Sequence, residues 1–121
     1  MQLPETWLAI ASLIVLCGAV IGGATTAYVR LADKDTPIDI GLLHGRAGLF
    51  GTMLLVLSVV IGNETGQSIK PAIGLLVLTV LGGIALYFII RRKGILPKSI
   101  ILIHGVFAMT AVYTILFGFP L

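Results

Sequence analysis

The sequence predicts an all-α membrane protein, a polytopic four-helix bundle made of two tandem helical-hairpin repeats. Three observations predict this fold. Hydrophobic residues make up 58% of the 121 residues and charged residues 11%, whereas roughly a quarter of the residues in a soluble domain are charged. The apolar residues lie in four runs, each close to the length of about 20 residues that a helix needs to cross a bilayer. The second half of the chain also repeats rare features of the first half at one fixed offset.

The four runs define the predicted spans in order. They cover residues 7–31, 39–62, 71–90 and 99–119. Three links rich in charged residues, glycine or proline separate them, with the sequences ADKDTPI, NETGQSIK and RRKGILPK. Sheets with open edges cannot satisfy their backbone polar groups in lipid, so each run is expected to be a helix. We expect a single membrane domain over residues 1–121, with the lipid bilayer as its surroundings.

The basic residues predict how the spans are oriented. Those on one side are Arg30, Lys34, Arg91, Arg92, Lys93 and Lys98, and the opposite side has Lys70. Cytoplasmic loops are enriched in lysine and arginine, so the first side is predicted to be cytoplasmic and both termini to lie outside the cytoplasm. We expect the chain in the cell inner (plasma) membrane. This topology explains the net charge of +3, so no nucleic-acid partner is expected.

An offset of 60 residues aligns the two halves of the chain without a gap. TPIDIGLLHG (36–45) lies over LPKSIILIHG (96–105). The rare residue types that coincide are Pro37 with Pro97, His44 with His104, and the glycine pair 22–23 with 82–83. Apolar sequence of low complexity also gives chance self-similarity, and that alternative stays open at this stage. A true repeat, over about 7–62 and 67–121, would relate two parallel hairpins by a pseudo-two-fold axis along the membrane normal.

Both histidines are predicted to lie at one depth. Asp39 and Ser99 are good N-cap residues, and each follows a proline by two positions. Each histidine comes five residues later, which places it roughly 7–8 Å into its helix at 1.5 Å per residue. His44 and His104 should therefore face each other near the cytoplasmic side.

The pattern around these histidines predicts a cofactor site. The small residues that share a helix stripe with a histidine, or lie at its depth, are Gly22, Gly45, Gly48, Gly51, Gly82, Gly105, Ala108 and Ala111. A haem fits the space they leave, because it is a flat apolar plate whose iron takes two axial imidazoles, and bundles build such sites between facing helices. Arg46 and the basic rim are expected to pair with its propionates. For Arg46, snorkelling to the interface or pairing with Asp39 or Asp35 is the alternative.

On its two His-Gly dipeptides, their shared depth and the number of spans, the sequence resembles the compact four-helix membrane cytochromes b that anchor respiratory oxidoreductases. The resemblance concerns mainly residues 39–62 and 99–119. It implies one haem b with His44 and His104 as iron ligands, and electron exchange with a quinone. Two-haem members of such families often carry four histidines, so two histidines imply at most one bis-histidine haem per chain.

Other interpretations of the histidines stay open. Either ring could hydrogen-bond across helices without a cofactor, or ligate the magnesium of a chlorophyll-type pigment. A transition metal bound by two histidines needs further ligands. The nearest in sequence are Asp33, Asp35 and Asp39, which lie in or beside the first link.

The small size of the chain predicts a supporting role. We expect a non-catalytic subunit of a membrane oxidoreductase complex, with other membrane or peripheral redox subunits as partners in a homo- or hetero-oligomer. A cofactor-free accessory or assembly subunit of a larger complex is the alternative. A proton-coupled transporter is disfavoured, because it needs an ionisable group in its pathway and no span has a carboxylate in its core.

Overall fold

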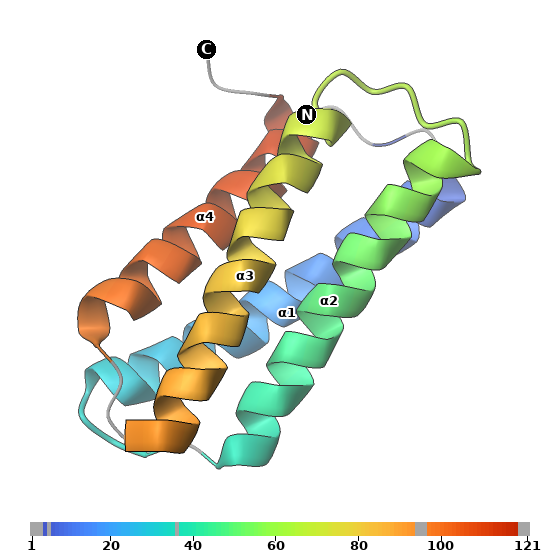
Figure 1. Ribbon diagram of the computed structural model, residues 1–121. Coiled ribbons are helices and arrows are strands. Elements are labelled where there is room, and N and C mark those ends of the chain that lie inside the picture. Colours follow the sequence, from blue (N-terminus) through green and yellow to red (C-terminus); the bar gives the residue numbers. More distant parts are fainter. Residues whose placement is uncertain (1–3, 5, 36, 94–96, 119–121) are drawn as a thin grey trace.

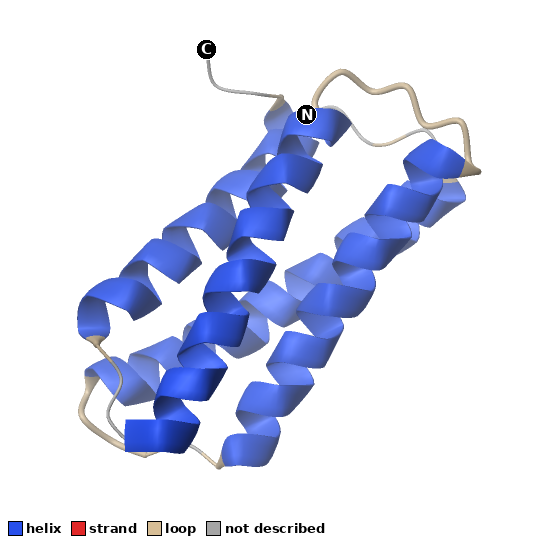
Figure 2. Ribbon diagram, viewed as in Figure 1, coloured by secondary structure: helices blue, strands red, loops and turns tan. Residues whose placement is uncertain are grey.

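The structure is a computed structural model that describes residues 4, 6–35, 37–93 and 97–118 (Figures 1 and 2). Its elements in chain order are α1 (Trp7–Leu31), α2 (Ile38–Val60), α3 (Ile69–Lys93) and α4 (Lys98–Phe117), with no strand in the described ranges. All four helices are long and apolar enough to cross a membrane. The predicted fold class is therefore confirmed, and the predicted spans differ from the helices by at most three residues at either end.

The helices form two antiparallel hairpins that pack side by side. α1 pairs with α2 and α3 with α4, and the hairpins meet where α1 contacts α4 and α2 contacts α3. The start of α1, the α2–α3 link and the end of α4 lie at one end of the bundle, and the end of α1, the start of α2, the end of α3 and the start of α4 lie at the other (Figure 1). We refer to these two ends as the terminal end and the link end.

The starts of α2 and α4 correct one prediction. Their N-cap residues are Pro37 and Pro97, and neither makes a side-chain capping hydrogen bond. Asp39 and Ser99 are therefore not N-caps, because each proline, with φ of −55° and −63°, already has the φ of a helix and starts it two residues earlier. Asp39 lies in the first turn of α2, where its charge favours the helix dipole.

The terminal end is fastened by a buried carboxylate. Thr6 caps α1, and both its backbone N and its Oγ1 donate to Glu64 Oε2 at 3.0 Å. The other oxygen, Oε1, accepts from Gly66 N at 3.1 Å. Glu64 belongs to the α2–α3 link, so these bonds join the start of α1 to the point where the chain passes to the second hairpin.

The hydrophobic core occupies one half of the bundle. Its buried members are Ala9, Leu13, Leu16, Leu55, Ile69, Ala72, Leu76, Ala111 and Ile115. All of them lie in the halves of their helices that are nearer the terminal end. In the half nearer the link end, the buried hydrophobic residue among those described is Ile101, while buried Ala19 lies at the middle of α1, beside His44. The histidines lie in this second half, which we call the histidine half.

Candidate functional site

The two histidines are brought together between the hairpins. His44 and His104 each lie six residues beyond the first residue of their helix, so they share one depth. Their ring centroids are 6.1 Å apart and the ring planes are nearly perpendicular, at 89°. α2 and α4 lie diagonally opposite in the bundle and do not contact each other through their backbones in the described residues. The imidazoles are thus the groups that approach across this diagonal.

His44 is held by the neighbouring helix of its own hairpin. Its Nδ1 lies 2.8 Å from the backbone oxygen of Ala19 in α1. A carbonyl oxygen only accepts, so Nδ1 carries a proton, and in the neutral ring Nε2 is then the nitrogen with the lone pair. The ring lies directly over Gly23, where an added Cβ would be 2.5 Å from the ring Cε1. Glycine at position 23 is therefore a condition for the position of this ring.

His104 repeats this arrangement at an offset of 60 residues, but less tightly. The equivalent glycine is Gly83, where an added Cβ would be 3.2 Å from the ring Cε1. The equivalent backbone group belongs to Thr79 and lies close enough to influence the ring. Even so, His104 Nδ1 is buried and no described group meets hydrogen-bond geometry with it. The two hairpins therefore place their histidines in corresponding positions, and the well-formed hydrogen bond belongs to the first.

The small residues predicted around the site fall into two groups. A Cβ added at Gly22, Gly45, Gly48 or Gly105 would meet no atom within 4 Å, and one at Gly82 would meet only His104 Nδ1, at 3.5 Å. Gly45 is exposed, so its open space lies at the surface, whereas Gly22, Gly48, Gly82, Gly105 and Ala108 are half-buried in the histidine half.

The second group belongs to the core. A Cβ at Gly51 would lie 2.8 Å from Leu16 Cγ, and the Gly51 carbonyl accepts a buried 2.6 Å hydrogen bond from Ser12 Oγ. Ala111 is fully buried in the same core. The structure therefore uses these two small residues for close helix packing and not as open walls beside the rings.

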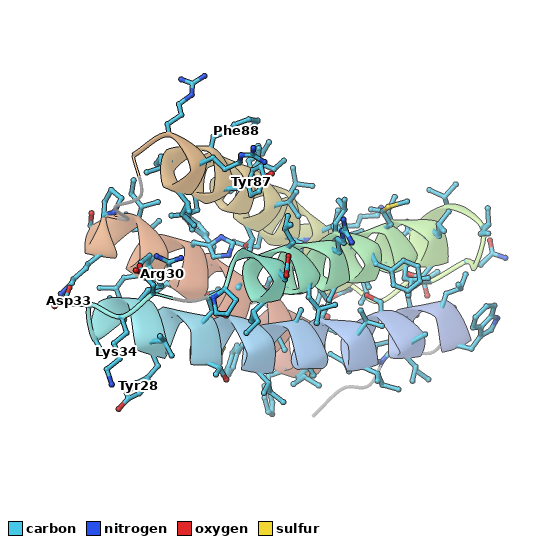
Figure 3. The ribbon with its side chains drawn as sticks, turned by 90° about the horizontal axis from the view of Figure 1, so that it is seen from below. Tyr28, Arg30, Asp33, Lys34, Tyr87 and Phe88 are labelled. Carbon is cyan, nitrogen blue, oxygen red and sulfur yellow. The ribbon has the colours of Figure 1, made fainter. Side chains whose placement is uncertain are left out.

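Charged side chains gather around the link end. Arg30 pairs with Asp35 at 3.2 Å, and Lys98 pairs with Asp33 at 3.0 Å. Figure 3 shows Arg30, Asp33 and Lys34 together at the end of α1. Arg46 is exposed, and it takes no part in the ion pairs formed within the described ranges. The predicted alternatives of an Arg46–Asp39 or an Arg46–Asp35 pair are thus not formed.

A bare metal site is not assembled here. Within the described part of the chain, no group of three or more histidine, cysteine, aspartate and glutamate side chains comes together. Two of the three aspartates considered as further ligands are in ion pairs with Lys98 and Arg30. Two imidazoles are then the donor set that the site offers.

Sequence reasoning found the histidines and missed the groups that hold them. The sequence shows the glycine pairs 22–23 and 82–83. It predicts Gly22 and Gly82 at the site, whereas the structure places Gly23 and Gly83 closest to the rings. The offset of 60 is the signal that could have found the second glycines. Ala19 and Thr79 act through their backbones and differ in residue type, so no sequence signal marks them.

No protein-family model, curated protein or solved structure matches this chain. The fold and the site nevertheless describe a class of protein. The class is a helical bundle whose four described helices are long and apolar enough to span a membrane, with two histidines facing each other inside the bundle.

Proposed function

We propose that the protein is a membrane electron-transfer subunit that binds one haem b, whose iron His44 and His104 would ligate. The observation that carries the proposal is the 6.1 Å separation of the two ring centroids. When each of two imidazoles gives one nitrogen to the same metal ion from opposite sides, with metal–nitrogen bonds of about 2 Å, their ring centroids are on the order of 6 Å apart. Perpendicular ring planes are compatible with that donor arrangement.

The hydrogen bond of His44 supports the same role. Histidines that bind metals almost always donate their other ring N–H to a carbonyl, a carboxylate or water, which fixes the tautomer and strengthens the donor nitrogen. His44 has this arrangement, with Nδ1 donating to the Ala19 carbonyl and Nε2 left free. The bond forms between two helices, so packing of α1 against α2 also sets the direction of the ligand.

The uneven packing of the bundle supports a bulky apolar occupant. The buried hydrophobic core lies in the terminal half, whereas Ile101 and, at the middle of α1, Ala19 are the buried hydrophobic residues described at or beyond the depth of His44. Half-buried Gly22, Gly48 and Gly105 have open space beside them. When bound, haem b supplies a one-electron redox centre. The surrounding helices would exclude water from it, and Arg46 with the basic rim would bind its propionates.

The charges at the two ends support an orientation. The described basic residues at the link end are Arg30, Lys34, Arg91, Arg92 and Lys98, and Lys70 lies at the start of α3, near the terminal end. By the positive-inside rule, the link end faces the cytoplasm of a cell whose inner membrane holds the protein. A single haem at this depth does not connect the two membrane surfaces. The subunit would therefore pass electrons to a quinone or to a partner redox subunit near the cytoplasmic side.

One observation favours a second candidate, a cofactor-free accessory subunit. The His44–Ala19 bond links α2 to α1, and hydrogen bonds between helices stabilise membrane bundles without any cofactor. The edge-to-face geometry of the rings is also one that aromatic pairs adopt in direct packing. A pigment-binding subunit is the third candidate, and an absorption spectrum distinguishes it from the other two.

The test is an absorption spectrum of the purified protein from haem-replete cells, recorded oxidised and then reduced with dithionite. We expect a b-type spectrum with one haem per chain, lost in His44→Ala and in His104→Ala. Leu43→Ala and Ile103→Ala are matched controls, since both side chains are exposed one residue before each histidine, and both should keep the spectrum. A folded but colourless wild-type protein would establish the accessory role instead, and a magnesium-pigment spectrum would indicate light harvesting.

A further inference from the structure

We propose that His104 is the ligand that can leave, so that its side of the site admits a small neutral molecule, while His44 stays bound. This inference rests on the proposed haem site and deepens it. If both histidines stayed bound, no position on the iron would be left for an added ligand. An exchangeable histidine gives the protein a second function, the binding of small neutral molecules such as carbon monoxide.

The first observation is the different anchoring of two otherwise equivalent rings. His44 Nδ1 has a hydrogen bond of 2.8 Å to Ala19. His104 Nδ1 is buried without a described partner, although the Thr79 backbone is near. A histidine whose second nitrogen is held by the protein keeps its orientation, whereas an unheld ring turns more easily away from its metal.

The packing of the two hairpins explains this difference. In the first hairpin, Ser12 Oγ donates to the Gly51 carbonyl at 2.6 Å, and glycine at position 51 lets Leu16 approach. At an offset of 60 residues the second hairpin has Ala72 and Ala111 in place of Ser12 and Gly51. It therefore lacks the hydroxyl donor, and a methyl group stands between α3 and α4 where α1 and α2 come close.

The distance between each ring and its glycine also differs between the hairpins, and it is shorter in the first hairpin. The Cβ position of Gly23 is 2.5 Å from the His44 ring, and that of Gly83 is 3.2 Å from the His104 ring. His44 thus approaches α1 more closely than His104 approaches α3. With haem bound, His104 would release the iron as a neutral imidazole and the incoming molecule would take its place, with no electron transferred.

The apolar surroundings define which ligands are admitted. The histidines lie within helices that can span a membrane, where a charged ligand would be costly. Half-buried Gly22, Gly48 and Gly105 have open space beside them, which a diatomic molecule is small enough to enter. Carbon monoxide, which is neutral and binds reduced haem iron, is the suitable probe.

The experiment adds carbon monoxide to the dithionite-reduced protein and follows the spectrum. We expect saturable binding to the wild type at a rate limited by His104 release. In the double variant Ala72→Ser/Ala111→Gly, which gives the second hairpin the contact of the first, the rate should fall roughly tenfold, the effect of one buried hydrogen bond. Ser12→Ala serves as the matched variant in the first hairpin and should leave the rate within a factor of about two, because His104 is not in that hairpin.

Variants with a cavity in place of each ligand identify the ligand that stays. His104→Gly should retain haem on His44, bind carbon monoxide without the slow step and bind added imidazole. His44→Gly should lose most of its haem. A reduced wild type with one haem that binds no carbon monoxide, or equal behaviour of the two glycine variants, would overturn this inference and leave the haem proposal intact. A wild type without haem would overturn both.

Discussion

The terminal half and the histidine half of this bundle are built from the same four helices but use their residues differently. The terminal half interdigitates leucine, isoleucine and alanine side chains, and its polar groups are buried with partners, as in the Ser12–Gly51 and Glu64–Thr6 bonds. The histidine half has glycines with open space and a polar atom left unpaired. The difference indicates that stability comes mainly from one half, which leaves the other half free to hold a ligand.

The strongest test of this comparison removes a side chain from the packed half. Leu55→Ala, at a fully buried position, should lower the free energy of unfolding by about 2–5 kcal/mol, because a cavity replaces well-packed methyl groups. The measurement is reversible unfolding in detergent micelles. The control is Leu43→Ala in the histidine half, whose leucine is exposed and whose loss should cost less than about 0.5 kcal/mol. Equal effects of the two variants would mean that the halves do not differ in stability.

A second variant acts on the histidine half without touching the core. Gly23→Ala places a Cβ against the His44 ring, which must move and lose its bond to Ala19. Changes to the partner of a metal ligand typically weaken binding by about 10–100-fold, and we expect a loss of haem affinity in that range. Gly18→Ala, on the same helix but outside the predicted site, is the control, because its Cβ meets no atom within 4 Å. Haem titrations that give the same affinity for both variants would contradict the role of Gly23.

The smallest expected effect concerns how much one buried hydrogen bond stabilises the first hairpin relative to the second. Ser12→Ala removes the hydrogen bond to Gly51 and should destabilise the protein by about 1 kcal/mol. Ala72→Ser, at the equivalent position of the second hairpin, is the matched change. In the absence of a glycine at position 111, it should gain little stability. A loss of stability in Ser12→Ala below about 0.3 kcal/mol would show that the bond contributes nothing net.

The sequence was sufficient to predict the helices, because each run of apolar residues is of membrane-spanning length and is bounded by prolines, charges or glycines. The equal depth of His44 and His104 also followed from helix geometry alone. The N-caps were wrong because proline and aspartate both favour helix starts, and the sequence does not show which of them comes first. The separate uses of Gly48 and Gly51 could not be predicted, since both lie on the stripe of His44. Only the position of Leu16 and the bond from Ser12 assign Gly51 to the core.

The contacts that close the two ends of the bundle also bear on how the protein is assembled. At the terminal end, buried Glu64 ties the start of α1 to the passage between the hairpins. At the link end, the ion pair described between the hairpins is the exposed Lys98–Asp33 contact, and exposed pairs are weak. We therefore expect the hairpins to close first around Glu64 during insertion, with the opposite end still able to separate. A large planar molecule could then enter from the cytoplasmic leaflet after the polypeptide has folded.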